Sequence, residues 1–598
     1  MVDRIKRNLL KLGLFSSLVP FLSSIKTAYA KTSFFDEFVA IKANSLDKVT
    51  VPAGFNYSIL CKWGDLLWDS TEKKENWASS SSYQKHAMGD NNDGMYFFHK
   101  NNINLMAVNN EYSNIATIYS DRNKKQPTTN DEIRASMYAH GVSIFEVKKI
   151  NGRWQVQKNS FFNIKITPFT KMSFTGPGKG SQFVKTRYDP NGLNPLGTWN
   201  NCSFGKTPWG TYLTCEENFN FYFSSSNKNK INKKLKRYSI KSKDRGYNWF
   251  KVDERFDITK EPNEPNRVGY IVEIDPWNPQ SVPKKHTALG RFKHENAEVV
   301  LSNDAKVVVY MGDDEKGEYI YKYVSNNKYE KNNGTGGDLL ENGRLYVAQF
   351  EESGTGNWIE LNEKTTGFDS FDKISIFTRD AATNAGATPM DRPEWIASNP
   401  FNAEIYCSLT NNKNRGIKKN LGGKEMPNLG PNPREKNQFG QIIKIIPGQM
   451  DHESNEFKWE IFALAGNPLK FSVNDLRSGS KNINQNNMFN SPDGLVFNSR
   501  GDLFIQTDGN YSDSDEFSGM GNNQMLVARP NTREIKRFLV GPKECEITGL
   551  TWSGDKKTMF VGIQHPGESS GSNFPDFDGS LPKSCIIAIE KNDNSVIG

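Results

Sequence analysis

The string SPDGLVFNSRGDLFIQTDG, residues 491–509, contains the pattern that decides the fold. Two short apolar runs, residues 494–497 and 503–507, flank a turn that is rich in Asn, Ser, Gly and Asp. Short β-prone runs separated by such turn residues are typical of a β-hairpin. Asp493 precedes the first run and Asp508 follows the second, so a hairpin brings both carboxylates to the same end.

The same pattern of run, turn and run recurs along the chain, at residues 297–311, 394–409 and 548–563. Long amphipathic helices are scarce, which indicates an all-β fold. Strand-rich repeats of about 40–50 residues are the sequence signature of a β-propeller, here an irregular one with long loop insertions. A sandwich of unrelated hairpins is the alternative. The propeller is favoured because the hairpins also share polar residues at their ends.

The composition excludes several classes of protein. The chain has 598 residues, 36% of them apolar, and contains 12 Trp, 21 Tyr and 38 Phe, which is too many aromatic residues for a disordered chain. Only one apolar run approaches the length of a membrane span, so a polytopic membrane protein is excluded. Neither Gly-X-Y triplets nor heptads occur, which excludes a collagen or a coiled coil.

The first 30 residues are interpreted as an export signal. A basic start (residues 4–11), an apolar run (residues 12–25) and an Ala-Tyr-Ala cleavage site (residues 28–30) are the three parts of a signal peptide. The Lys6-Arg7 pair resembles a twin-arginine signal whose first Arg is replaced by Lys, so the export route stays open. An uncleaved membrane anchor is the alternative. Residues 31–598 are predicted to form one domain, located in the periplasm or secreted.

The charge balance gives no indication of a nucleic-acid partner. Residues 1–30 hold five basic residues and one acidic residue, so their removal lowers the net charge from +8 to +4. A nearly neutral chain of this length lacks the basic footprint of a nucleic-acid-binding protein. The cysteines are sparse and form no CxxC pair, so no disulfide scaffold is expected and a thiol is available for a metal. They are Cys61, Cys202, Cys215, Cys407, Cys545 and Cys585.

Two long insertions interrupt the β pattern. Residues 224–247 hold nine Lys and Arg side chains, and such a run is expected to be a solvated loop, with an anionic-surface patch as the alternative. Residues 411–438 are rich in Asn, Gly, Lys and Pro and are expected to form a loop on one face of the propeller.

The residues at the hairpin ends indicate a metal site. In a propeller, the same end of every innermost hairpin surrounds one central opening, so these side chains converge. Carboxylates a few ångströms apart repel one another unless a cation neutralises them. Carboxylate and Asn oxygens suit calcium, whereas a thiolate among them indicates iron or zinc. The positions before a first run are occupied by Cys202, Glu295, Glu394, Asp493 and Glu546, and those after a second run by Glu216, Glu217, Asp313, Asp314, Asn411, Asp508 and His565.

These residues also have structural interpretations. The alternatives include solvated side chains for Glu216 and Glu217, an ion pair between Arg392 and Glu394, and an inert buried thiol for Cys202. Their joint occurrence at equivalent places favours the metal site. The chain has no HExxH motif and no G-x-S-x-G motif, so neither an ordinary zinc hydrolase nor a serine hydrolase is indicated.

Seven strings, in their order and spacing, resemble the PhoX-type alkaline phosphatases, a family of exported, calcium-dependent enzymes. The resemblance covers roughly residues 85–570, nearly all of the chain after the signal. The strings are NNCSFGKTPWGTYLTCEENF (200–219), KHENAEVV (293–300), VVVYMGDDEKGEYIYKYV (307–324), DRPEWIASNP (391–400), SPDGLVFNSRGDLFIQTDG (491–509), CEITGLTW (545–552) and GIQHPGE (562–568).

The resemblance implies a six-bladed propeller with a cluster of two Fe³⁺ and three Ca²⁺ ions at its centre. Cys202 is similar to the family's thiolate ligand of iron, and Arg392 to the residue that contacts the substrate phosphate. The implied carboxylate ligands are Glu295, Glu394 and Asp493 for iron and calcium, and Glu216, Glu217 and Asp314 for calcium.

The implied reaction is the metal-assisted hydrolysis of small-molecule phosphate monoesters, which scavenges inorganic phosphate outside the cytoplasm. One alternative is a calcium-dependent propeller lactonase or esterase, which needs no thiolate, so Cys202 discriminates against it. The other is a non-catalytic exported binding propeller with structural calcium. We expect a monomer without a nucleic-acid partner and without a stable membrane span after signal cleavage.

Overall fold

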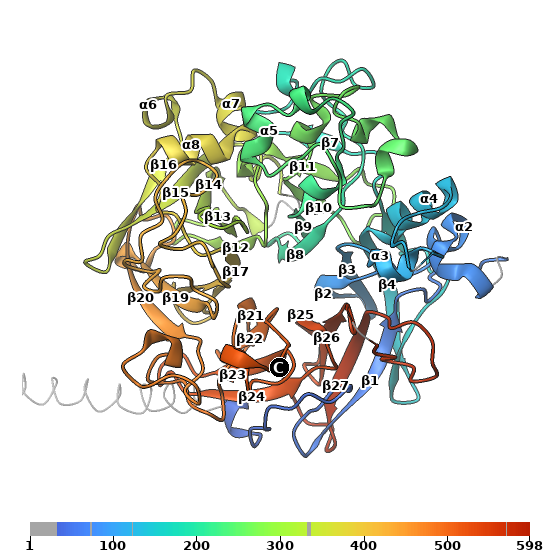
Figure 1. The fold of residues 1–598 in the computed structure, drawn as a ribbon, viewed down its shortest axis with the longest axis vertical. Helices are drawn as coiled ribbons and strands as arrows, with labels where there is room; N and C mark the ends of the chain where they lie inside the picture. Colours follow the sequence, from blue (N-terminus) through green and yellow to red (C-terminus); the bar gives the residue numbers. More distant parts are fainter. Residues whose placement is uncertain (1–32, 72–73, 122, 332–335, 570) are drawn as a thin grey trace, which may run out of the picture.

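The structure, a computed structural model, describes residues 33–598 except residues 72–73, 122, 332–335 and 570. The predicted export signal, residues 1–30, lies outside the described residues. Strands are arranged radially around a central axis, and the few short helices lie away from it (Figure 1). The all-β fold class is therefore confirmed.

The described strands pair into five hydrogen-bonded sheets, one of which has nine strands. This sheet consists of two antiparallel meanders joined through their outer strands, β16 and β20. The strands thus form six meanders, here called blades 1 to 6, and the predicted six-bladed propeller is confirmed.

Blades 1 to 3 follow one another along the chain. Blade 1 contains β2 (Asn92–Lys100), β3 (Ile103–Asn110), β4 (Gly141–Ile150) and β5 (Arg153–Val156), with β6 (Ile164–Ile166) also paired to β4. Blade 2 contains β8 (Asn201–Lys206), β9 (Tyr212–Glu216), β10 (Ile271–Ile274) and β11 (Lys284–His286), with β7 (Ser173–Thr175) parallel to β11. Blade 3 contains β12 (Glu298–Leu301), β13 (Lys306–Gly312), β14 (Ile320–Lys328), β15 (Gly343–Phe350) and β16 (Thr355–Glu360).

Blades 4 to 6 complete the ring. Blade 4 contains β17 (Pro393–Ser398), β18 (Ile405–Leu409), β19 (Gln441–Pro447) and β20 (Glu456–Leu464). Blade 5 contains β21 (Pro492–Phe497), β22 (Leu503–Thr507), β23 (Gln524–Ala528) and β24 (Ile535–Val540). Blade 6 contains β25 (Glu546–Trp552), β26 (Thr558–Gln564), β27 (Cys585–Lys591) and β1 (Phe55–Lys62). The four hairpins predicted from the sequence are all present, as β12–β13, β17–β18, β21–β22 and β25–β26.

The innermost strands contact their neighbours in a closed ring, in the order β2, β8, β12, β17, β21 and β25. The chain closes this ring through β1, which pairs antiparallel with β27 and so completes the last blade with the first strand. The N-terminal strand is thereby hydrogen-bonded into the C-terminal blade, which ties the two ends of the ring together.

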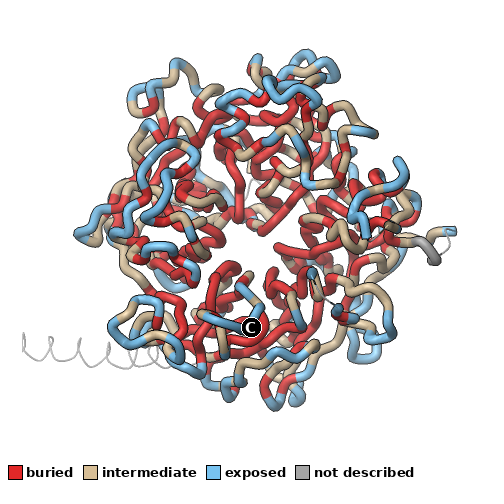
Figure 2. Tube along the Cα trace, viewed as in Figure 1, coloured by how far each residue is buried: buried red, intermediate tan, exposed pale blue. Residues whose placement is uncertain are grey.

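Apolar side chains fill the space between adjacent blades. Phe504, Met525 and Phe538 of blade 5 pack with blade 6 in one buried cluster. A second cluster contains Trp395 and Ile505 and joins blade 4 to blade 5. Burial extends along the inner strands toward the axis (Figure 2). The hairpins are therefore held at fixed positions around the axis, which is what a precise central site requires.

The helices are short and belong to the connections between strands. The longest, α4, carries a capping box at Thr129 and Glu132. Among the described residues, no helix has the length and apolarity that crossing a membrane requires. The helices are α2 (Ser81–Gln84), α3 (Ile115–Ile118), α4 (Asn130–Ala139), α5 (Lys233–Arg237), α6 (Glu363–Thr366), α7 (Phe371–Ile376) and α8 (Thr378–Asn384).

The insertion at residues 224–247 differs from the solvated loop expected from its charge. Leu235, Arg237 and Ile240 are buried, and the Arg237 guanidinium makes a two-pronged ion pair with the buried Glu318 of blade 3. The Tyr238 hydroxyl donates to the backbone carbonyls of Arg291 and Ile376. Lysines at both ends of the insertion remain exposed, but its centre is anchored to the propeller.

The insertion at residues 411–438 is a loop, as expected, but it is also held by buried charges. Arg415 is buried and pairs with Asp391 at 2.7 Å. Arg434, also buried, donates to the backbone carbonyl of Ala465.

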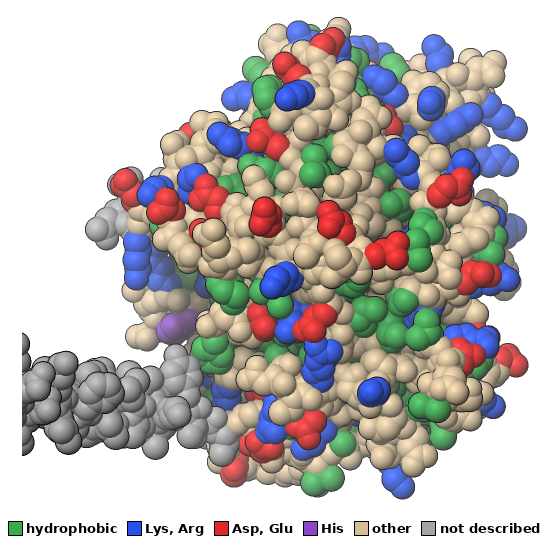
Figure 3. Space-filling view, turned by 90° about the vertical axis from the view of Figure 1, so that its left-hand side faces the viewer, with side chains coloured by type: hydrophobic (Ala, Val, Ile, Leu, Met, Phe, Trp, Pro, Cys, Tyr) green, Lys and Arg blue, Asp and Glu red, His purple; other side chains and the backbone are tan. Residues whose placement is uncertain are grey.

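On the flank formed by β15, β16 and β20, acidic and basic side chains are both spread over the surface (Figure 3).

Candidate metal centre

One irregularity recurs in the innermost hairpin of every blade: the inner strand carries one extra residue. In blade 4, Pro393 pairs with Leu409 and Ile396 pairs with Cys407, so two residues face one. A β-bulge of this kind re-aims a side chain. The same shift occurs in the other five blades. The first residue of each bulge, here called the axial position, is in blades 1 to 6 Asp93, Cys202, Glu295, Glu394, Asp493 and Thr548.

A second ring of side chains comes from the other strand of each hairpin. We call the residue two positions beyond the last one that faces the bulge, in the partner strand, the exit position. All six exit positions but the one in blade 5 are buried. They are, in blades 1 to 6, Glu111, Glu217, Asp314, Thr410, Asp508 and Gln564.

Potential ligand atoms from these two rings lie close together. Cys202 Sγ is 2.9 Å from Asp93 Oδ2 and 3.0 Å from Glu295 Oε1. Four groups have ligand atoms that all lie within 4.8 Å of one another, and the first three share members. The groups are Asp93, Glu111 and Cys202; Cys202, Glu217 and Glu295; Glu295, Asp314 and Glu394; and Asp508, Glu546 and His565. These residues together with Asp493 are called the axial cluster below.

The electrostatics of the axial cluster fit multivalent cations. Burial, reinforced by neighbouring carboxylates, raises the pKa values of Glu295 and Glu394 well above their usual range. Burial also raises the pKa of Asp93 to about 6. Within the part of the chain that the structure describes, Glu217 Oε1 and Asp493 Oδ1 are buried without a hydrogen-bond partner. Unpaired buried oxygens and carboxyl groups that resist ionisation are characteristic of a carboxylate cage that takes up a cation.

Cys202 is the one soft donor of the axial cluster. Burial and the adjacent Asp93 and Glu295 raise the pKa of its thiol well above the ordinary value. On its own the thiol therefore stays protonated, and its S–H donates to these carboxylates. A bound transition metal deprotonates a coordinating thiol outright, so a reactive free thiol is not needed for a ligand role.

Arg392 lies at the edge of the axial cluster. Its Nε and Nη2 donate to the two oxygens of Asp314 at 2.6 and 2.8 Å, and Nη2 lies 3.1 Å from Glu394 Oε1. Although burial opposes its charge, these carboxylates raise the pKa of Arg392, so it stays a cation. Burial likewise opposes ionisation of Asp314, yet Arg392 lowers the pKa of that carboxyl.

Arg392 also has an unusual backbone. Asn91, Asn200, Arg392 and Ser491 each stand two residues before an axial position, and their φ angles are 43°, 52°, 54° and 48°. Left-handed backbone costs a non-glycine residue about 1–2 kcal/mol, and Asn tolerates it best. A long cationic side chain at such a place indicates that the direction of the guanidinium matters, because strained residues concentrate at functional sites.

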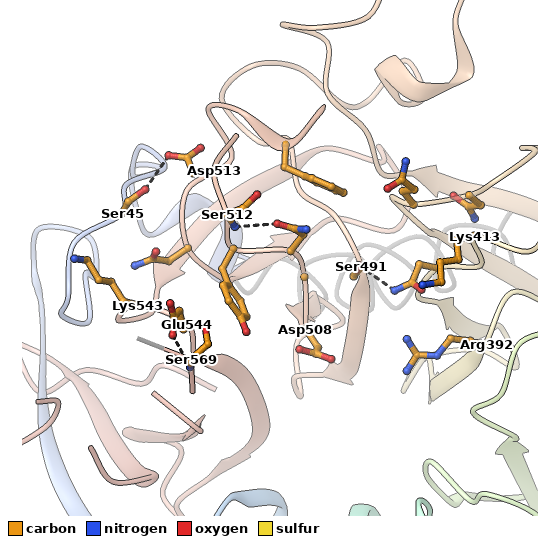
Figure 4. A pocket seen from close by; sticks show the side chains of 18 residues that line it. Ser45, Arg392, Lys413, Ser491, Asp508, Ser512, Asp513, Lys543, Glu544 and Ser569 are labelled. Atoms are coloured by element: carbon orange, nitrogen blue, oxygen red, sulfur yellow. Dashed lines mark hydrogen bonds between the residues drawn. The ribbon is translucent and has the colours of Figure 1, made fainter. Parts of the chain in front are cut away.

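Two cavities meet at Arg392. The larger, called the polar cavity, has a volume of about 1000 Å³ and is also lined by Asn411, Lys413, Asp508 and Lys543. Figure 4 shows Arg392 and Asp508 facing the same open space from neighbouring blades. The smaller, called the basic cavity, measures about 730 Å³. It is lined by Lys241, Lys243, Arg245, Lys293, Lys316 and Arg392. A ligand held at Arg392 thus reaches either cavity.

Six of the seven residues expected to bind metal meet in the axial cluster, and the seventh, Glu216, does not. Successive residues of a strand point to opposite faces, so Glu216 and Glu217 diverge. Glu216 accepts from the buried Lys285 ammonium at 2.7 Å and from the backbone N–H groups of Gly269 and Tyr270. The expected calcium-ligand role of Glu216 is therefore corrected to that of a buried ion pair within blade 2.

This divergence predicts opposite outcomes for two neighbouring substitutions. Glu216→Gln leaves Lys285 buried and unpaired, and we expect a loss of about 3–5 kcal/mol of stability with unchanged metal content. Glu217→Gln removes a charge from the axial cluster, and we expect reduced metal content with little loss of stability in the metal-free protein. Thermal unfolding and elemental analysis of both variants measure this. Equal effects of the two substitutions on metal content would contradict the assignment.

The sequence reasoning missed part of the cluster. Asp93 and Glu111 of blade 1 were not identified, although the string NNDGMYFFHKNNINLMAVNNE (91–111) repeats the run, turn and run with an acid at each end. In blade 6, Glu546 was taken as the residue equivalent to Cys202. The register instead places Thr548 there, and its hydroxyl donates to Asp93. Glu546 groups with Asp508 and His565.

Comparison with known proteins matches both a family and a solved structure. A family model described as "Alkaline phosphatase PhoX" matches residues 36–567. The solved structure of Pseudomonas fluorescens PhoX in complex with vanadate, a transition state analogue, has 44% sequence identity and a TM-score of 0.90. That match covers 94% of this chain and 98% of that chain. No curated protein gave a significant match.

Two further solved structures are only weakly similar. The Trichoderma reesei carbohydrate-active enzyme of family AA12 has 11% identity and a TM-score of 0.32, covering 92% of this chain and 100% of that chain. The Fusarium graminearum GH93 α-L-arabinofuranosidase, in complex with arabinobiose, has 7% identity and a TM-score of 0.30, covering 89% and 98%. These scores are too low to support any statement about the chain.

Proposed function

Because the chain belongs to the PhoX alkaline phosphatase family and is a phosphatase, we propose that its axial cluster is the metal centre at which phosphate monoesters are hydrolysed. The observation that carries this proposal is the approach of Cys202 Sγ to within 2.9 and 3.0 Å of carboxylate oxygens from two other blades. A thiol, many buried carboxylates and one guanidinium converge only at this place among the described residues.

We propose that the cluster holds two Fe³⁺ and three Ca²⁺ ions. Cys202, Asp93 and Glu295 form the mixed sulfur and oxygen set that suits iron. The all-oxygen set of Glu295, Asp314 and Glu394 suits calcium, which prefers carboxylates. Asp508, Glu546 and His565 offer a further set that includes one imidazole. When bound, such cations polarise phosphoryl oxygens and allow water to act as a nucleophile at neutral pH.

The chain's own residues orient the substrate. Asp314 and Glu394 fix the plane of the Arg392 guanidinium, and the strained backbone aims it across the cavity mouth. Because Nε and Nη2 are paired with Asp314 and Glu394, the two N–H groups of Nη1 are the ones that can be presented to phosphoryl oxygens in a fixed plane, which a point charge cannot do. Thr548 donates to Asp93 and leaves the other Asp93 oxygen directed at Cys202. Catalysis of phosphoryl transfer depends mainly on such positioning and charge stabilisation.

Family membership sets aside the two alternatives raised by the sequence, a propeller lactonase or esterase and a non-catalytic binding propeller. We further propose that residues 1–30 direct the protein to the periplasm or the medium, where it releases inorganic phosphate from small phosphate esters. That the enzyme is a monomer stays a prediction.

Substitution of Arg392 tests the proposed substrate contact. We expect Arg392→Lys to lower kcat/KM for p-nitrophenyl phosphate about 10²–10³-fold, because the charge is kept but the bidentate geometry is lost. Arg533→Ala is the matched control, since Arg533 also has left-handed backbone (φ 60°) and pairs with a glutamate, Glu460, on the flank. Unchanged turnover in Arg392→Lys would contradict the role of Arg392.

A further inference from the structure

We propose that the basic cavity is a subsite for a second phosphate group on the substrate, so that the enzyme prefers phosphate esters that carry two phosphates. The proposal rests on the proposed function, since it takes Arg392 as the contact of the phosphate that is cleaved. It assigns a role to the Lys- and Arg-rich insertion, whose charged residues border this cavity.

The charge of the basic cavity is strongly positive. Its lining has six cationic side chains against three acidic ones. Two of the acids are already engaged: Asp314 by Arg392, and Glu315 by Lys293 at 3.0 Å. Within the described residues, Lys241, Lys243 and Lys316 have no carboxylate within ion-pair distance. Unpaired cations gathered around a concave surface attract and hold anions.

The basic cavity is a built feature of the fold. The buried pair between Arg237 and Glu318 anchors the insertion to blade 3. Two residues further on, the Ser239 hydroxyl donates to Glu315 at 2.9 Å, the same carboxylate that pairs with Lys293. The exposed cations of residues 241–245 come directly after the anchored residues Arg237 and Ser239 in the chain, so they are held over the cavity.

Phe221 organises the cations on both sides of the basic cavity. The Arg245 guanidinium stacks on its ring at 3.7 Å, and the Lys293 ammonium lies 5.5 Å from the same ring. This brings one cation from the insertion and one from blade 3 to a common platform. The platform adjoins Asn218, which accepts from Lys293 at 2.9 Å.

The polar cavity provides an internal comparison. Its lining has three cations, Arg392, Lys413 and Lys543, against three acids, Asp508, Asp513 and Glu544. Because both cavities open at Arg392, a neutral leaving group fits the polar cavity, and an anionic one is drawn to the basic cavity. The basic cavity has a volume of about 730 Å³, which accommodates a small sugar phosphate, since ligand sites span roughly 300–1,000 Å³.

Steady-state kinetics with paired substrates test this subsite. Fructose 1,6-bisphosphate and fructose 6-phosphate differ by one phosphate, and p-nitrophenyl phosphate reports the basal reaction. We expect wild type to favour the bisphosphate by more than the statistical doubling from its second ester. In the triple variant Lys241→Ala, Lys243→Ala, Arg245→Ala, we expect kcat/KM for the bisphosphate to fall about tenfold to hundredfold, with p-nitrophenyl phosphate nearly unchanged.

A second triple variant controls for the loss of three charges. Lys228, Lys230 and Lys236 belong to the same insertion, are exposed and line neither cavity. Replacing them with Ala is expected to leave the preference for the bisphosphate intact. All six side chains are exposed, so both triple variants are expected to fold, which circular dichroism verifies. The single variant Lys243→Glu is expected to reduce the preference for the bisphosphate as the first triple variant does.

The outcomes separate this inference from the proposed function. A preference for the bisphosphate that disappears in the first triple variant and survives in the control supports the subsite. Equal losses for all three substrates, or no loss for any, overturn the subsite while leaving phosphatase activity established. Absence of p-nitrophenyl phosphate hydrolysis by the wild-type enzyme would overturn the proposed function itself.

Discussion

Removal of the metal ions by dialysis against EDTA is expected to abolish phosphatase activity and to invert the pH dependence of stability. Activity is lost because the axial cluster then holds carboxylates, a thiol and an imidazole, with Arg392 at its edge, but no Lewis acid to activate water. Restoring both iron and calcium is expected to recover turnover, whereas calcium alone is expected to recover less. Assays with p-nitrophenyl phosphate after each addition measure this.

The pH effect follows from the raised pKa values. Asp93 has a pKa of about 6 in the folded protein, compared with about 4 in an unfolded chain. Between these values the metal-free folded protein binds more protons than the unfolded chain, so its stability falls as the pH rises. For Asp93 alone the loss is on the order of 3 kcal/mol. Glu295, Glu394 and Asp493, whose pKa values are raised further, extend the loss to higher pH.

The metal-loaded enzyme is expected to behave in the opposite way. Cations bind the ionised carboxylates, so acidification displaces them and lowers stability. Melting temperatures of both forms between pH 5 and pH 8 therefore change in opposite directions. Identical pH profiles for the two forms would contradict the assignment of these carboxylates as metal ligands.

Cys202→Ser is expected to reduce kcat by at least about 10²-fold and to lower the iron content while calcium is largely retained. A hydroxyl has nearly the shape of a thiol, but it is a much poorer donor to iron. The matched control is Cys407→Ala, because Cys407 is also buried but lies in the apolar cluster between blades 3 and 4. The control is expected to lose stability and keep its iron.

Elemental analysis and turnover of the two cysteine variants separate these effects. Full activity with undiminished iron in Cys202→Ser would show that the thiol is an inert buried side chain. Loss of iron in both variants would show that iron content follows stability and not ligation.

The fold class could be predicted from the sequence because each hairpin has its own recognisable sequence pattern. Alternating apolar runs, turn residues and repeated polar ends identified β12–β13, β17–β18, β21–β22 and β25–β26. Blade 1 was not predicted as a source of ligands because Asp93 follows two other polar residues, Asn91 and Asn92. The sequence therefore does not show where its strand begins.

The errors within the site have local physical causes. A run of two acids, such as Glu216-Glu217, does not reveal which one faces the axis until the strand register is known. Likewise, whether Glu546 or Thr548 takes the axial position depends on where the bulge lies in the strand, and the sequence does not show the position of the bulge. The insertion at residues 224–247 was expected to be solvated because charge dominates it, whereas its buried centre, which includes the ion pair of Arg237 with Glu318, fixes its position.

Anomalous X-ray diffraction from crystals of the purified enzyme is the direct test of whether the axial cluster is a polymetal hydrolytic centre. Data collected on both sides of the iron absorption edge are expected to show iron peaks beside Cys202 Sγ, Asp93 and Glu295, with calcium peaks among Asp314, Glu394 and Asp493. Anomalous density absent from the axis in an enzyme that still hydrolyses p-nitrophenyl phosphate would contradict a metal centre in the axial cluster.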